Sequence, residues 1–101
     1  TDSVWSRTDG GSFTFTASLM PGTYDVYTWW TEWPSRYTAV PHQIRDGGTL
    51  LDTVNMNQQT NGGQWNLLGR YTFGGTAGVT ILATPGTWST AADAVRFVPV
   101  P

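Results

Sequence analysis

Short runs of alternating apolar and polar residues, separated by turn residues, recur along the whole chain. In Ser12–Leu19 the Phe and Ala residues alternate with Thr and Ser, which is the pattern of a half-buried strand. Met20–Thr23 carries a Pro-Gly pair and Asp46–Thr49 carries Asp-Gly-Gly, both of which favour tight turns. About seven short strands with turn signals between them predict an antiparallel sandwich or barrel.

The other expected strands follow the same logic. They are Thr23–Trp30, His42–Arg45, Leu50–Asn57, Trp65–Phe73, Val79–Ala83 and Ala92–Val98. In Trp65–Phe73 the apolar phase slips between Leu68 and Tyr71, and Gly69 is the expected position of a β-bulge that absorbs the slip. We expect no helix.

The composition bounds the size and the class of the protein. A chain of 101 residues is one domain with a modest core, so residues 1–101 are read as a single unit. Charged residues make up only 12% of the chain, and the absence of a basic run argues against nucleic-acid binding. The chain has no Cys, no basic amphipathic helix and no apolar run near the roughly 20 residues of a membrane span, so we expect no membrane insertion.

Aromatic residues concentrate in the stretch Tyr27–Tyr37, which holds three of the six Trp residues. Trp30 is in phase with Tyr24 and Val26, and we predict that it lies in the core. Trp29 lies on the opposite face with Tyr27. That face is either the outer surface of a sheet or a groove that another strand covers.

Several segments resemble, in order, one known family. They are "PGTYDVYTWW", "RYTAVP", "DGGT", "NQQTNGGQWNLLGRYTF" and "ADAVRF". Together they are similar to the golvesin C-terminal domain, also described as the carbohydrate-binding-like domain of xanthan lyase, over Phe13 to Val98. The resemblance implies an all-β, antiparallel jelly-roll sandwich of the galactose-binding-domain-like type. It also implies an accessory module of secreted bacterial enzymes and surface proteins, and it supplies no established ligand residues.

Two features depart from that family. The family has an opening strand, whereas this chain begins only a few residues before Ser12, so we expect the sandwich to lack the N-terminal strand. Residues 1–11 are then an extended or interface-forming segment, and either upstream residues have been removed or another chain supplies the strand. The connection after Trp30 is usually small and polar in the family, so Trp33 and Tyr37 are particular to this protein.

Loop aromatics and one arginine are the candidate ligand-binding residues. Sugars present C–H faces that pack on aromatic rings, and loops run over surfaces and carry function. The predicted set is Trp29, Trp33, Arg36, Tyr37 and Trp88. The alternatives are that the loop aromatics cover one end of the core and that Arg36 pairs with Glu32 or Asp93 instead of an acidic sugar.

Three other groups are read as structural. The amides of Gln58–Gln64 favour a turn held by side-chain-to-backbone bonds over a sugar site. Trp65 is predicted to be a core anchor, and Asp93 and Arg96 to belong to the scaffold.

Catalysis has little support in the sequence. The only His is His42, on a short strand, and the acidic residues form no close pair of the glycosidase kind. No D-x-D-x-D calcium pattern exists. We expect no enzyme activity, no metal and no cofactor.

The leading hypothesis is a non-catalytic carbohydrate-binding accessory module of a secreted or cell-surface bacterial protein, with a polysaccharide as its partner. The alternative is a structural subunit of an extracellular filament or surface layer, in which a neighbouring chain completes the edge of the sandwich.

Overall fold

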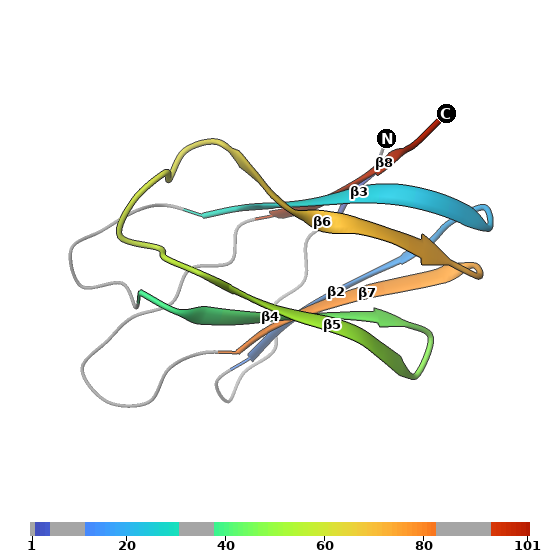
Figure 1. The fold of residues 1–101 in the computed structure, drawn as a ribbon, viewed down its shortest axis with the longest axis horizontal. Helices are drawn as coiled ribbons and strands as arrows, with labels where there is room; N and C mark the ends of the chain where they lie inside the picture. Colours follow the sequence, from blue (N-terminus) through green and yellow to red (C-terminus); the bar gives the residue numbers. More distant parts are fainter. Residues whose placement is uncertain (1, 5–11, 31–37, 83–93) are drawn as a thin grey trace.

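The computed structural model describes residues 2–4, 12–30, 38–82 and 94–101, which form two four-stranded antiparallel sheets packed face to face (Figure 1). The first sheet has the order β1 (Asp2–Val4), β8 (Ala94–Pro99), β3 (Gly22–Trp29) and β6 (Trp65–Phe73). The second has the order β2 (Ser12–Ser18), β7 (Thr76–Leu82), β4 (Val40–Asp46) and β5 (Thr49–Met56). Consecutive strands alternate between the sheets except at the β4–β5 hairpin, and the predicted all-β jelly-roll sandwich is confirmed.

The chain supplies an opening strand that the sequence pattern does not reveal. β1 pairs with β8 from Asp2 opposite Phe97 to Val4 opposite Val95, so the opening and closing strands lie side by side (Figure 1). The prediction that no strand precedes Ser12 is therefore wrong. A three-residue strand is too short for an alternating pattern to show, and its pairing partner is distant in sequence.

The core lies between the two sheets and is built from their inward-facing side chains. Its buried members are Phe15, Tyr24, Val26, Val40, Ile44, Leu68, Phe73, Ala77, Val79, Ile81, Val95 and Phe97. The rings of Phe73 and Phe97 meet edge to face, with centroids 5.8 Å apart. Trp30 is 2% exposed, which confirms its predicted place in the core.

A β-bulge divides β6 into two segments. Odd-numbered residues point to the core after the bulge and to the outer face before it. Val26 of β3 is opposite Gly69, but the next residue, Tyr27, is opposite Leu67. Leu68 is therefore the extra residue, and it is buried. The bulge predicted at Gly69 is confirmed within one residue.

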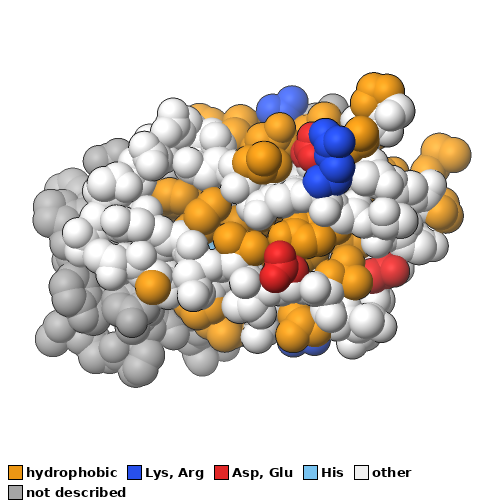
Figure 2. Space-filling view, viewed as in Figure 1, with side chains coloured by type: hydrophobic (Ala, Val, Ile, Leu, Met, Phe, Trp, Pro, Cys, Tyr) orange, Lys and Arg blue, Asp and Glu red, His pale blue; other side chains and the backbone are white. Residues whose placement is uncertain are grey.

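A side-chain hydrogen bond joins the two sheets on the side of the sandwich formed by β5 and β6. Tyr71 of β6 donates a hydrogen bond from its hydroxyl to Asp52 of β5, at 2.8 Å. Figure 2 shows hydrophobic side chains along the middle of this side, with few charged groups around them. Val54 and Met56 of β5 are partly buried and pack against the core. None of the described residues belongs to a helix, so that part of the chain has no helix that could cross a membrane.

Candidate functional site

Two tryptophans lie side by side on the outer face of the first sheet. Trp29 of β3 is directly opposite Trp65 of β6, and both are half-buried. Their rings meet edge to face, with centroids 5.3 Å apart and an angle of 77° between the planes. Directly opposite cross-strand residues have Cβ atoms about 5 Å apart, so the contact follows from the register. Each ring is thus partly covered by the other, and both residues keep some exposure to solvent.

The next row of the same face adds an aromatic, an aliphatic and a cationic side chain. Tyr27 of β3 lies between Leu67 of β6 and Arg96 of β8. Leu67 is 53% exposed. The guanidinium carbon of Arg96 lies 5.6 Å from the centroid of the Trp65 ring, which is a cation–π contact.

These two rows form one continuous surface. We call it the aromatic surface, and it consists of Tyr27, Trp29, Trp65, Leu67 and Arg96. A partly exposed apolar group of this kind is typical of a binding surface.

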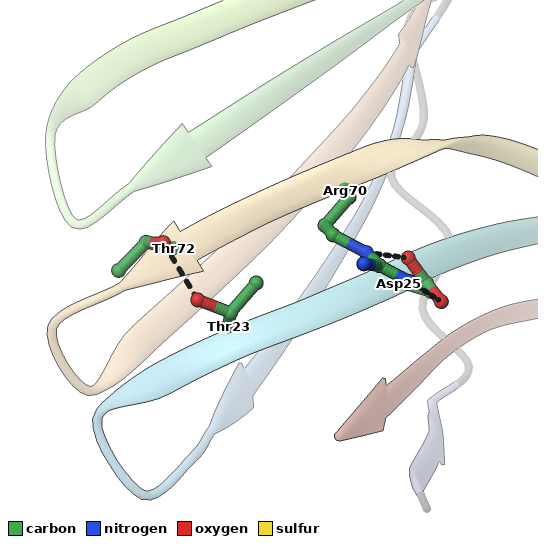
Figure 3. A network of polar contacts seen from close by, with 4 residues as sticks. All are labelled: Thr23, Asp25, Arg70 and Thr72. Atoms are coloured by element: carbon green, nitrogen blue, oxygen red, sulfur yellow. Dashed lines mark hydrogen bonds and ion pairs between the residues drawn. The ribbon is translucent and has the colours of Figure 1, made fainter. Parts of the chain in front are cut away.

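The other end of the outer face is polar and internally satisfied. Arg70 of β6 donates from Nε and a terminal nitrogen to the two carboxylate oxygens of Asp25 of β3, at 2.9 and 3.2 Å (Figure 3). The hydroxyls of Thr23 and Thr72 lie 2.9 Å apart in the next row (Figure 3). The hydrogen bond from Arg70 lowers the pKa of Asp25. The face thus has an apolar end and a charge-neutral polar end.

A loop rich in amides fixes the end of β3 where Trp29 lies. The indole nitrogen of Trp30 donates to the carbonyl of Thr60 at 3.0 Å, and the amide of Gly63 donates to the carbonyl of Trp30 at 2.9 Å. The side chain of Asn66 donates to the carbonyls of Asn61 and Gln64 at 3.0 and 3.1 Å. These bonds support the predicted turn role of the loop and hold the Trp29 side of the sheet in place.

The structure describes one of the five predicted ligand-binding residues. Trp29 is part of the aromatic surface. The other four, Trp33, Arg36, Tyr37 and Trp88, lie outside the described residues.

Trp65 and Arg96 belong to the aromatic surface, although neither is among the predicted ligand-binding residues. The prediction that Trp65 is a core anchor is wrong, because the bulge at Leu68 places it on the face opposite to that of Phe73. Counting the alternation backwards from the predicted bulge would have found this. Arg96, read as scaffold, lies on the outer face, and no local signal shows which ring it approaches.

His42 is a buried core residue. Its Nδ1 donates to the carbonyl of Val40 at 2.9 Å, and Nε2 has no hydrogen-bond partner among the described residues. Burial lowers the pKa of His42 to about 4, and the backbone hydrogen bond with Val40 opposes part of this shift. Within the described ranges, no three His, Asp or Glu side chains lie close enough together to hold a metal ion.

Three solved structures share this fold. A Paenibacillus xanthan lyase is 40% identical with a TM-score of 0.81, and the match covers 93% of this chain and 9% of the lyase chain. A Podospora anserina GH26-CBM35 β-(1,4)-mannanase is 14% identical with a TM-score of 0.58, covering 100% of this chain and 25% of the mannanase. A family 35 carbohydrate binding module from an environmental isolate is 15% identical with a TM-score of 0.57, covering 91% of this chain and 68% of the module.

The last two similarities establish the fold alone, whereas the first extends to the sequence. A comparison with proteins of curated function found no match. The model of the Golvesin C-terminal domain matches residues 3–99, nearly the whole chain. The chain belongs to the Golvesin C-terminal domain family.

Proposed function

We propose that the chain is a non-catalytic carbohydrate-binding module, accessory to a larger secreted bacterial protein, and that it binds a polysaccharide on the aromatic surface. The observation that carries this proposal is the half-buried pair of Trp29 and Trp65 on the outer face of the first sheet. Two further findings support the same proposal. The chain belongs to the Golvesin C-terminal domain family, and it is 40% identical to part of a xanthan lyase, an enzyme named for a polysaccharide.

Ring stacking explains why such a surface suits a sugar. The C–H faces of a pyranose pack on an indole as apolar surface, at roughly 25 cal/mol for each Å² removed from water. The hydroxyls of the sugar stay in solvent or find polar neighbours at the rim. Because association itself has an entropic cost, one such site gives modest affinity, and a polymer that contacts several rings binds better.

We propose that the predicted loop residues extend the aromatic surface. Trp33, Arg36 and Tyr37 follow directly on the end of β3, and Trp88 belongs to the segment that leads into Ala94. Because Ala94 is opposite Trp29 in the sheet, both segments attach at the Trp29 end of the outer face. We propose that they add aromatic contacts and one guanidinium at that end.

The test is a polysaccharide panel measured by isothermal titration calorimetry. We expect Trp29→Ala and Trp65→Ala to weaken binding at least tenfold, since each removes a stacking partner. Leu50→Ala is the matched control, because Leu50 is also a well-exposed strand residue, 47% exposed, but lies on β5 of the other sheet. Near-ultraviolet circular dichroism confirms that each variant is folded. Absence of binding by the wild type, or equal binding by Trp29→Ala, overturns the proposal.

An assembly subunit is the second candidate. The observation that favours it is β5, an edge strand of the second sheet that exposes Leu50 and Leu51 by 47% and 39%. Exposed apolar edge strands are templates for pairing with another chain. Under this hypothesis the polysaccharide panel is negative and the protein associates with itself.

A further inference from the structure

Arg96 gives the aromatic surface a positive charge that no carboxylate on the described strands β3, β6 and β8 neutralises. We propose that this surface selects an acidic polysaccharide, in which Arg96 binds the carboxylate of a uronic acid residue while the neighbouring indole rings pack on the sugar. The proposal rests on the proposed carbohydrate-binding function and names the class of ligand for the same site.

The position of Arg96 is set by the sheet. Arg96 belongs to β8 and is opposite Tyr27 of β3, whereas Trp65 belongs to β6 on the far side of β3. Because the guanidinium carbon lies 5.6 Å from the centroid of the Trp65 ring, the two side chains meet over β3. The charged group therefore lies among the rings of the aromatic surface.

The hydrogen-bonding capacity of Arg96 is unused by the described residues. The structure describes three arginines. Arg70 forms an ion pair with Asp25, and Arg45 donates to the side-chain oxygen of Gln43 at 3.1 Å. Among the described parts of the chain, no oxygen acceptor binds Arg96, and its contact is with the Trp65 ring. A guanidinium beside a ring still presents planar N–H donors at its edge, which match the two oxygens of a carboxylate.

The local charge favours an anion although the chain as a whole is acidic. The formal net charge is −2. On the outer faces of β3, β6 and β8, however, the carboxylate of Asp25 is occupied by Arg70, at the other end of the face. Among the described residues of these three strands, Arg96 is thus a positive charge without a carboxylate partner, next to half-buried rings. An uncharged glycan would not supply that partner.

A single uronic acid residue satisfies both parts of the surface. Its pyranose ring carries C–H groups for an indole, and its carboxylate is attached to the same ring. The short separation of the Arg96 guanidinium from the Trp65 ring lets one sugar residue contact both. A neutral sugar uses only the rings.

The experiment compares acidic polymers with their neutral counterparts. Xanthan, polygalacturonate and alginate are titrated into the protein by calorimetry, each in its native form and after chemical reduction of the carboxylates to alcohols. We expect the wild type to prefer a native form. Arg96→Gln should weaken binding of that form roughly ten- to a hundredfold and weaken binding of the reduced form much less.

The matched control is Arg70→Gln. Arg70 lies on the same outer face and is more exposed, but its charge is already paired. We expect this variant to bind the native polymer as the wild type does. Raising NaCl from about 50 to about 500 mM should weaken wild-type binding and have less effect on Arg96→Gln. Arg96→Lys keeps the positive charge but lacks the planar guanidinium. Its affinity for the native polymer should lie between those of the wild type and Arg96→Gln.

The outcomes separate this inference from the proposed function. If native and reduced polymers bind equally, or if Arg96→Gln binds like the wild type, the acidic preference is overturned while carbohydrate binding stands. If no polysaccharide binds, both are overturned. If Trp65→Ala and Arg96→Gln instead abolish self-association without polysaccharide, the occupant of the surface is a second copy of the chain. Equal thermal unfolding temperatures of Arg96→Gln and Arg70→Gln show that a difference in affinity between them does not come from a difference in folding.

Discussion

At the residue scale, His42 links the stability of the core to pH. Its imidazole is fully buried and neutral, and the proton on Nδ1 is bonded to Val40. Protonating Nε2 would place a second charged N–H group in the core without an acceptor among the described residues. The fold therefore opposes protonation of a group that the unfolded chain protonates near pH 6.5.

We predict that the free energy of unfolding falls as the pH falls from about 6.5 to about 4. The folded pKa is below the unfolded one, so the unfolded state binds more protons in this window, and stability present above it is lost on acidification. The slope is up to about 1.4 kcal/mol per pH unit. Urea unfolding at a series of pH values measures it.

His42→Leu is the control for that prediction, since leucine fills similar space and does not titrate. The variant is expected to have a different stability at neutral pH but a flat profile between pH 6.5 and 4.5. A wild-type profile equally flat in that window would show that the prediction is wrong.

Gly69 leaves space for the Tyr71 side chain, whose hydrogen bond to Asp52 joins the two sheets. A Cβ atom at this position would lie 2.5 Å from the hydroxyl oxygen and 2.8 Å from the Cζ atom of Tyr71. The Tyr71 ring also packs beside Phe73, with centroids 6.5 Å apart. Burial, followed by the hydrogen bond to Asp52, raises the pKa of Tyr71 to about 12.

We predict that Gly69→Ala destabilises the domain by roughly 1–3 kcal/mol, because the tyrosine must move and lose its bond to Asp52. Thermal and urea unfolding measure the loss. In a Tyr71→Ala background the same substitution should cost much less, since the clash is gone. Equal costs in both backgrounds would place the effect elsewhere.

At the element scale, the loop between β5 and β6 fixes the end of β3. Its bonds to Trp30 come from Thr60 and Gly63, and Gln58 is fully buried within it. Gly63 has φ of +69°, a conformation that residues with a side chain adopt at a cost. The element that carries Trp29 thus depends on the geometry of a loop far along the chain.

Gly63→Ala is therefore expected to lower the free energy of unfolding by roughly 1–2 kcal/mol through backbone strain. The matched control is Gly48→Ala, in the β4–β5 turn, where φ is not in the left-handed region and no atom lies within 4 Å of a new Cβ. That variant should be neutral or slightly stabilising. Chemical unfolding of both variants tests this, and a larger loss for Gly48→Ala would contradict it.

At the scale of the whole molecule, the two sheets are completed by strands of one chain. β1 covers the edge of β8, and its pairing is antiparallel over three residues. The core between the sheets is built mainly from aliphatic and aromatic side chains. A neighbouring chain is not needed to supply a strand to either described sheet.

We accordingly predict that the isolated chain folds as a monomer. Sedimentation velocity over a hundredfold range of concentration should give a single slow species, together with a cooperative thermal transition. Association that grows with concentration and disappears in Leu50→Ala or Leu51→Ala would instead support the assembly candidate, because those side chains lie on the open edge of β5.

The sequence by itself determined what depends on local patterns. Alternation along Ser12–Leu19 specified a half-buried strand, Asp46–Thr49 specified the hairpin, and the phase of Trp30 specified its burial. These features follow from neighbours within a few residues. The family segments determined the jelly-roll arrangement, which is confirmed.

Only the tertiary structure decided which side chains meet on the outer face. A one-residue bulge at Leu68 reverses the face of Trp65, and the pairing of β8 with β3 brings Arg96 beside a ring that is 31 positions earlier in the sequence. The short strand β1 likewise exists through its partner β8. Register and cross-strand contact are long-range properties, so composition and periodicity cannot fix them.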